Sequence, residues 1–136
     1  MSKGESPLSL SVVTPERSVL EEGCASVSLP ATEGYLTVLP GHTSLVSTLA
    51  VGVLSYRQGT KEGALALSGG FFEVSDDVVT VLTQEAQLPD EIDAEAARKE
   101  LQEASDSLGR LSGEELRQAR LTVQRAEARL AVSSKQ

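Results

Sequence analysis

The chain has 136 residues, a single cysteine and a formal net charge of −8. Its length suits one or at most two small domains. One cysteine excludes an internal disulfide, and no Cys and His cluster has metal-ligand spacing, so we expect a reducing compartment and no structural metal. Because nucleic acid and anionic lipid bind cationic surfaces, the acidic balance argues against both as main ligands. No stretch of about 18 apolar residues predicts a transmembrane segment, and no signal peptide is expected.

Short apolar segments separated by turn residues fill the sequence up to about residue 84. In 8–12 and 25–29 apolar side chains alternate with serine, which is typical of strands with one buried face. Residues 58–60 and 75–77 have turn chemistry, and Ser68 to Gly70 is interpreted as a tight turn. Four segments are more continuously apolar and are interpreted as strands covered on both faces: 51–56, 64–67, 71–74 and 78–82. Eight to ten short strands are too many for one flat sheet, so residues 1–88 are predicted to form an antiparallel β-sandwich.

Helical periodicity replaces strand periodicity near residue 89. The first helix has Asp90 or Asp93 as its N-cap, ends at Gly109, and carries an apolar stripe of Ala94, Ala97, Leu101, Ala104 and Leu108. A capping box at 112–115 starts the second helix, whose stripe is Leu116, Ala119, Val123, Ala126 and Leu130. Both stripes repeat at spacings of 3 and 4, so residues 89–136 are predicted to form an antiparallel two-helix hairpin. The predicted fold class is α+β, mainly β.

Alanine dominates both stripes, which bears on how firmly the hairpin holds together. Because alanine buries little apolar area, such a seam is stabilised less than a leucine seam at about 25 cal/mol per Å². A permanently docked hairpin and one that can open or leave the sandwich both agree with this pattern.

No residue pattern predicts catalysis. The only histidine, His42, has Thr43 and Ser44 as nearby nucleophiles, but no oriented base or oxyanion site accompanies them. Arg125 and Arg129 lie four residues apart on one helix face and could bind phosphate or carboxylates, although solvated arginines are the simpler interpretation. We therefore do not expect an enzyme.

Several segments taken together resemble one protein family. They are SVVTPERSVLEEG, LPATEGYLTVLPGHTSLVSTLAVGVLSYR and LSGGFFEVSDDVVTVL, followed by a two-helix tail with QRAEARL. In this order they are similar to the epsilon subunit of bacterial F-type ATP synthase over about residues 8–132. The resemblance implies a β-sandwich followed by a helical hairpin, in agreement with the residue patterns.

The resemblance also implies a non-catalytic rotor subunit. Its sandwich would bind the gamma subunit and the membrane-embedded ring, coupling proton transport to ATP synthesis. Glu33, Gly34, Tyr35 and His42 match the ring and stalk contacts, although the position of Tyr35 is often acidic in the family. Because the chain has few aromatic residues, the stalk contact is expected to use aliphatic strand faces. The subunit would be peripheral on the cytoplasmic face of the bacterial inner membrane.

For the hairpin, the resemblance implies movement between a folded position on the sandwich and an extended one that inhibits ATP hydrolysis. Arg117, Arg120, Arg125 and Arg129 are the candidates for pairing with acidic segments of the catalytic beta (and alpha) subunits.

Some family members also bind ATP on the folded hairpin. Ile92, Asp93, Arg125 and Arg129 match their pattern, but Ala96 stands where the pattern has arginine. No tight cofactor is therefore expected, and ATP binding should be weak or absent.

An alternative function remains open at this stage. The chain could be a free-standing small-ligand or nucleotide-sensing sandwich whose helices form a fixed lid. A hydrolase centred on His42 is a third, weaker hypothesis. The order of the motifs favours the rotor subunit.

Overall fold

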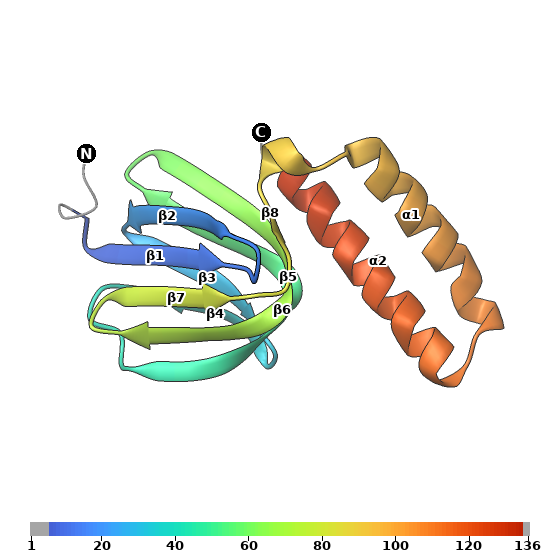
Figure 1. Cartoon of the computed structure of the whole chain (residues 1–136), viewed down its shortest axis with the longest axis horizontal. Coiled ribbons are helices and arrows are strands. Elements are labelled where there is room, and N and C mark those ends of the chain that lie inside the picture. Colours follow the sequence, from blue (N-terminus) through green and yellow to red (C-terminus); the bar gives the residue numbers. More distant parts are fainter. Residues whose placement is uncertain (1–5, 135–136) are drawn as a thin grey trace.

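The computed structural model describes residues 6–134, and it shows a β-sandwich with a two-helix hairpin packed against one side (Figure 1). The strands are β1 (Leu8–Val13), β2 (Ser18–Cys24), β3 (Ser26–Ala31), β4 (Gly34–Val38), β5 (Leu45–Gln58), β6 (Lys61–Ser75), β7 (Val78–Leu82) and β8 (Ala86–Gln87). The helices are the 3-10 turn η2 (Pro89–Glu91), α1 (Ala94–Ser107), the 3-10 turn η3 (Leu108–Arg110) and α2 (Gly113–Ser133). The predicted fold class is confirmed. The predicted segments 1–88 and 89–136 extend into 1–5 and 135–136, which lie outside the described residues.

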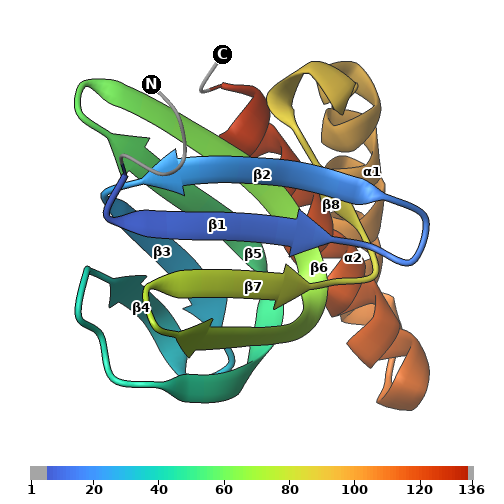
Figure 2. The ribbon, with the colours of Figure 1, turned by 60° about the vertical axis from the view of Figure 1, so that its left-hand side comes forward.

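The strands form one sheet in the order β2-β1-β7-β6-β5-β3-β4, with β8 also paired to β6. This sheet folds over on itself into two layers, as the side view shows (Figure 2). β1 and β7 pair in parallel, whereas the other described pairs are antiparallel. The sandwich is thus antiparallel, as predicted, apart from one pair that joins the first strand to the seventh.

Two long strands, β5 with 14 residues and β6 with 15, run through both layers. The segments 64–67 and 71–74, predicted to be separate strands, are both parts of β6. The tight turn predicted at Ser68 to Gly70 is therefore wrong. These glycines instead bend a continuous strand, with φ of 99° at Gly69 and 127° at Gly70. A Cβ on Gly70 would lie 2.1 Å from the carbonyl oxygen of Leu82, so only glycine fits at this bend.

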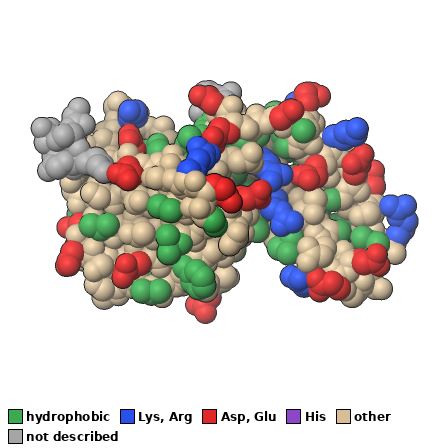
Figure 3. All heavy atoms as spheres, in the orientation of Figure 1, with side chains coloured by type: hydrophobic (Ala, Val, Ile, Leu, Met, Phe, Trp, Pro, Cys, Tyr) green, Lys and Arg blue, Asp and Glu red, His purple; other side chains and the backbone are tan. Residues whose placement is uncertain are grey.

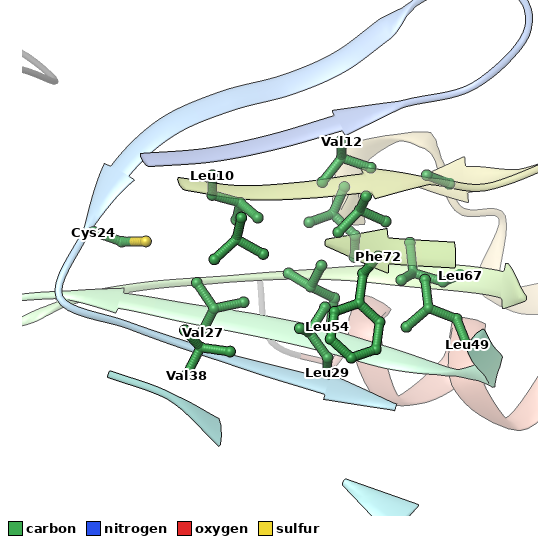
Figure 4. Close-up of a cluster of buried hydrophobic side chains, with 14 of the residues drawn as sticks. Leu10, Val12, Cys24, Val27, Leu29, Val38, Leu49, Leu54, Leu67 and Phe72 are labelled. Carbon is green, nitrogen blue, oxygen red and sulfur yellow. The ribbon is translucent and has the colours of Figure 1, made fainter. Parts of the chain in front are cut away.

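The main core lies between the two layers (Figure 4). Its fully buried side chains come from every long strand and include Leu10, Val12, Val27, Leu29, Leu54 and Phe72. Cys24 is buried at the edge of this core, as expected for a small apolar residue. Coverage on both faces is confirmed for 64–67 but is wrong for 71–74 and 78–82, where alternate side chains are exposed. The reason is tertiary, because α2 covers only one part of the outer surface.

Helix α1 begins with a side-chain cap, whereas α2 does not. The carboxylate of Asp93 accepts a hydrogen bond from the amide of Ala96 at 3.0 Å and caps α1. Ser112 occupies the N-cap position of α2, but its hydroxyl makes no capping hydrogen bond, so the predicted capping box is wrong. Gly113 follows with φ of 60°, outside the helical range, and in the same turn Glu114 binds Arg117.

Helix α2 lies between α1 and the sheet and has two apolar faces (Figures 1 and 2). The predicted stripes face each other in the hairpin and are half-buried or buried. A second face, which the periodicity argument missed, brings Ala128 and Val132 against Ala64 and Ala66 of β6. Among the described residues, no helix is both long enough and apolar enough to cross a membrane.

Candidate functional site

Exposed apolar side chains cluster on the outer surface of β1, β5, β6 and β7. We name this cluster the outer patch; it consists of the exposed Val46, Phe71, Val78 and Leu82 and the half-buried Val13. Phe71 and Leu82 are cross-strand partners and are 58% and 51% exposed. Val13 continues their row on the far side of Leu82. Hydrophobic side chains gather on this face of the sandwich (Figure 3).

Two hollows of about 330 and 220 Å³ flank the Phe71–Leu82 pair. Thr14 and Gly70 line the larger one, and Val46 and Thr80 line the smaller one. An apolar ridge between two hollows can interlock with another protein surface. Glu73 lines the smaller hollow and is the only titratable residue among the described residues that line the two, so the lining holds no acid–base pair for catalysis. The outer patch therefore has the character of a protein-interaction surface.

Glu33, Gly34 and Tyr35 lie together at the β3–β4 turn. The Tyr35 ring is 63% exposed, yet its hydroxyl accepts a hydrogen bond from the amide of Val53 at 3.0 Å. The pairing of β3 with β5 is irregular between Ser28 and Ala31, opposite this part of β5. Tyr35 therefore both presents its ring to solvent and holds β5 where the ladder is interrupted.

His42 does not join these three residues. It lies in the loop between β4 and β5, which follows the opposite end of β4 from Gly34. Its Nδ1 lies 2.7 Å from the carbonyl oxygen of Thr43, and the neighbouring Gly41 amide donates to the carboxylate of Asp77 at 2.8 Å. The four predicted ring and stalk residues thus occupy two ends of the sandwich. Sequence reasoning missed the outer patch, because 71–74 and 78–82 were interpreted as covered on both faces; it expected only that a stalk contact would use aliphatic strand faces.

The four predicted head-contact arginines fall into two pairs. Arg117 and Arg120 are exposed on the half of α2 nearer the hairpin turn. Arg117 binds Glu114 through two nitrogens at 2.6 and 3.0 Å. These hydrogen bonds, with one from Gln118 and the positive charge of Arg117, lower the pKa of Glu114 to about 2.

The second pair, Arg125 and Arg129, faces the sandwich. Basic side chains are visible where the hairpin meets the sandwich (Figure 3). Arg129 Nε donates to Gln87 Oε1 at 2.7 Å, and its Nη1 donates to Glu100 Oε1 at 2.9 Å. Its Nη2 lies 3.8 Å from Glu85 Oε1. Sequence reasoning missed these three partners because they are 29 to 44 residues away along the chain.

Of the predicted ATP residues, only Arg125 and Arg129 share one hollow. It is also lined by Ser68, Glu85 and Gln87, and its volume is about 10 Å³. That is room for about one water, whereas small-molecule pockets measure roughly 300–1,000 Å³. Ile92 packs on the Ala64, Ala66, Ala128 and Val132 cluster, and Asp93 caps α1. The docked hairpin therefore holds no preformed nucleotide cavity at these four residues.

Comparison with known proteins decides the family. Residues 7–89 match the family model described as ATP synthase, Delta/Epsilon chain, beta-sandwich domain. The ATP synthase epsilon chain of Solibacter usitatus (strain Ellin6076) is 40% identical over 129 residues, covering 94% of this chain and 96% of the relative. That of Synechococcus sp. (strain RCC307) is 42% identical over 127 residues, covering 90% and 94%. The chain belongs to the ATP synthase epsilon family.

Solved structures agree with this assignment. A chain of the Euglena gracilis mitochondrial ATP synthase, in a structure of OSCP, F1 and the c-ring, superposes with a TM-score of 0.80 at 31% identity. The match covers 91% of this chain and 79% of that one. A chain of the Tetrahymena thermophila mitochondrial ATP synthase gives a TM-score of 0.60 at 15% identity over 96% of both chains, which shows the shared fold. As an epsilon chain of ATP synthase, the protein is a non-catalytic subunit, as predicted.

Proposed function

We propose that this epsilon chain links the gamma subunit to the membrane-embedded ring in the rotor, and that its hairpin inhibits ATP hydrolysis when it leaves the sandwich. Proton flow through the ring would thereby be coupled to ATP synthesis. The subunit would be peripheral on the cytoplasmic face of the membrane and held there by the complex. The observation that carries the proposal is the outer patch, an exposed apolar surface in a family of synthase subunits.

The outer patch is proposed as the gamma contact. Phe71 is the largest of its exposed side chains and stands between the two hollows, which suits an anchor residue. The ring contact is then assigned to the end of the sandwich that carries the exposed Glu33–Tyr35 turn, because the loop of His42 lies at the other end. Tyr35 cannot supply the negative charge that many relatives carry at that position, so this ring contact would rest on its exposed ring face.

The catalytic-head contact is assigned to the arginines of α2 in two stages. Arg117 and Arg120 are exposed in the docked hairpin, whereas Arg125 and Arg129 face the sandwich. Release of the hairpin would expose all four to acidic segments of the beta and alpha subunits. Ion pairs are stronger in partly buried interfaces. After release, Arg125 and Arg129 would therefore contribute most to the binding of the catalytic head.

ATP binding is proposed to be weak or absent. Glu85 and Glu100 already place carboxylates beside Arg129, and Ala96 provides no cation for a phosphate. Calorimetric titration of the full chain with ATP tests this point, and an affinity in the micromolar range would contradict it.

The gamma contact is tested by the affinity of full-length variants for a catalytic core that contains gamma and lacks epsilon. Phe71→Ser should weaken binding by about tenfold or more, since a central apolar anchor contributes over 1 kcal/mol. Leu39→Ser is the matched control, because Leu39 is 55% exposed and lies outside the outer patch. Equal affinities for Phe71→Ser and the unmodified chain would refute the assignment.

Inhibition is tested with the same core by measuring ATP hydrolysis. The full chain should inhibit, and residues 1–88, verified to be folded by circular dichroism, should bind without inhibiting. If both bind and neither inhibits, the subunit couples but does not inhibit. If neither binds a cognate core, the rotor assignment fails.

A further inference from the structure

One side chain touches all three parts of the docked arrangement. Arg129 extends from α2 to Gln87 on β8, to Glu100 on α1 and to Glu85 in the segment before β8, at 2.7, 2.9 and 3.8 Å. The guanidinium group suits this position because its donors form a rigid planar fork. Its side chain is 25% exposed, whereas those of Glu85 and Glu100 are 64% and 45% exposed, so the guanidinium group is partly desolvated while its carboxylate partners meet solvent.

The apolar contacts around Arg129 are small. The sheet offers Ala64 and Ala66, and α2 offers Ala128 and Val132. Helix α1 packs on α2 rather than on the sheet, along the alanine-rich seam. Since alanine gains little from burial, the polar contacts of Arg129 are a large share of what joins these surfaces.

The connecting segment is itself bound to the sandwich up to residue 91. The amide of Thr83 donates to the carbonyl of Val13, the amide of Glu85 donates to the hydroxyl of Ser68, and β8 pairs with β6. Glu91 forms an ion pair with Arg17 at 2.7 Å. Movement of the hairpin therefore pivots after Glu91. Beyond this pivot, Ala128 and Val132 make apolar contacts with β6, and Arg129 makes polar contacts with both β8 of the sandwich and α1.

We propose that Arg129 is a latch that couples two events, the separation of α2 from the sandwich and the separation of α2 from α1. While Arg129 binds Glu100 and Gln87 together, neither surface opens without weakening the other. Because the latch consists of partly exposed charges, salt should release both surfaces together. This inference rests on the proposed release of the hairpin. Its test is made on the isolated full chain, so it does not require the assembled synthase.

The test measures two distances by pulsed electron resonance in the full chain. Spin labels at Gln102→Cys and Gln124→Cys report on α1 and α2, and labels at Lys61→Cys and Gln124→Cys report on α2 and the sandwich. The native Cys24 is buried and its pKa is raised to about 11, so labelling at neutral pH is selective for the introduced cysteines. For each label pair, the long-distance fraction is the share of molecules in which the two labels are farther apart than in the docked structure. In the chain that keeps Arg129, both fractions should rise together as NaCl is raised to about 1 M, where the Debye length is ~3 Å.

In the Arg129→Gln variant, the α2–sandwich long-distance fraction at low salt should rise about tenfold, as expected for lost charge-assisted hydrogen bonds. Glu100→Gln weakens the contact of Arg129 with α1 but keeps its contacts with Gln87 and Glu85. The α1–α2 long-distance fraction should therefore rise more than the α2–sandwich fraction. Arg110→Gln is the matched control, because it removes the same charge at the hairpin turn and should change neither fraction.

A charge exchange separates coupling from simple stabilisation. Arg129→Glu combined with Glu100→Arg restores the attraction between α1 and α2, but it places a carboxylate against Glu85. The α1–α2 distance should then recover while the α2–sandwich distance stays long. The proposal is overturned if Arg129→Gln behaves like Arg110→Gln, or if the exchange restores both distances. Loss of hydrolysis inhibition with intact latch behaviour would instead count against the proposed function alone.

Discussion

The hydroxyl of Tyr35 accepts a hydrogen bond from the amide of Val53 at 3.0 Å, although most of the tyrosine ring is exposed. Tyr35 also lies over Gly52, where an added Cβ would approach the tyrosine oxygen to 2.9 Å and Pro30 Cβ to 2.7 Å. A residue at a predicted ring contact thus has a local structural role, and its two contacts can be tested separately.

Tyr35→Phe should lower the free energy of unfolding by about 1 kcal/mol, because the Val53 amide loses its acceptor. Gly52→Ala should cost about 1–3 kcal/mol, because the new methyl group has no space. Both are measured by urea unfolding of the full chain. Tyr56→Phe removes the same atom from the other tyrosine and serves as the control; a larger loss there than at Tyr35 would contradict the role of the Val53 contact.

Enlarging Ala66 should undock the hairpin without unfolding the sandwich. The side chain of Ala66 points outward beneath α2, whereas its neighbours Leu65 and Leu67 are in the main core. Ala66→Leu should destabilise the docked position by about 1–3 kcal/mol. Hydrogen exchange should then accelerate in α2 and stay slow in β1 and β7.

Ala96→Leu is the control for that experiment, because Ala96 is exposed on α1. If Ala66→Leu leaves the exchange of α2 unchanged, the contact of α2 with β6 does not hold the hairpin in solution.

Asp77 should control the loop that carries His42. Its backbone is left-handed, with φ of 62°, and its carboxylate accepts a hydrogen bond from the Gly41 amide at 2.8 Å. Asp77→Ala loses the acceptor and disfavours the turn, which should cost about 1–3 kcal/mol. Asp77→Asn retains an acceptor and tolerates this conformation, so it should cost much less.

Amide exchange of Gly41, followed by NMR, distinguishes the two Asp77 variants. We expect fast exchange in Asp77→Ala and protection close to that of the native chain in Asp77→Asn. Equal protection in both variants would show that the side-chain contact does not order this loop.

Stability should fall at alkaline pH because of Cys24. Burial, with a smaller effect of the Glu22 charge, raises the pKa of its thiol from 9.0 to about 11. At pH 8 and below, the thiol is mostly protonated in both the folded and the unfolded state. Between pH 9 and about 11 the unfolded chain loses this proton more readily than the folded chain. Ionisation therefore stabilises the unfolded state, and the free energy of unfolding falls.

By about pH 10.5 this difference should remove ~2 kcal/mol of unfolding free energy. Urea unfolding at pH 8 and at about pH 10.5 measures it, with Cys24→Ala as the comparison. Burial raises the pKa of Tyr56 in both proteins, and the smaller effect of the Cys24 charge on Tyr56 is lost only in Cys24→Ala, so it counts as part of the Cys24 contribution. An equal loss in both proteins would show that the Cys24 thiol is not the group responsible.

Local patterns predicted most of the architecture. The alternation in 8–12 and 25–29 identified β1 and β3, because one face of each strand must be apolar to pack. The 3 and 4 spacing identified both helices, and Asp93 was correctly one of two N-cap candidates. The motif order identified the family, which the comparisons confirmed. The same patterns failed at Ser68 to Gly70, because a glycine bend within a strand and a turn between strands have similar compositions.

The sequence by itself determined the class of fold, the hairpin and the family, because periodicity and motif order are properties of neighbouring residues. Only the tertiary structure decided which faces are covered, since 71–74 and 78–82 read as buried yet expose the outer patch where no helix lies over them. It also decided that Tyr35 binds Val53 and that Arg129 joins Gln87 to Glu100. Such pairs form because folding brings distant segments of the chain together. The spacing of residues along the sequence does not show which segments meet.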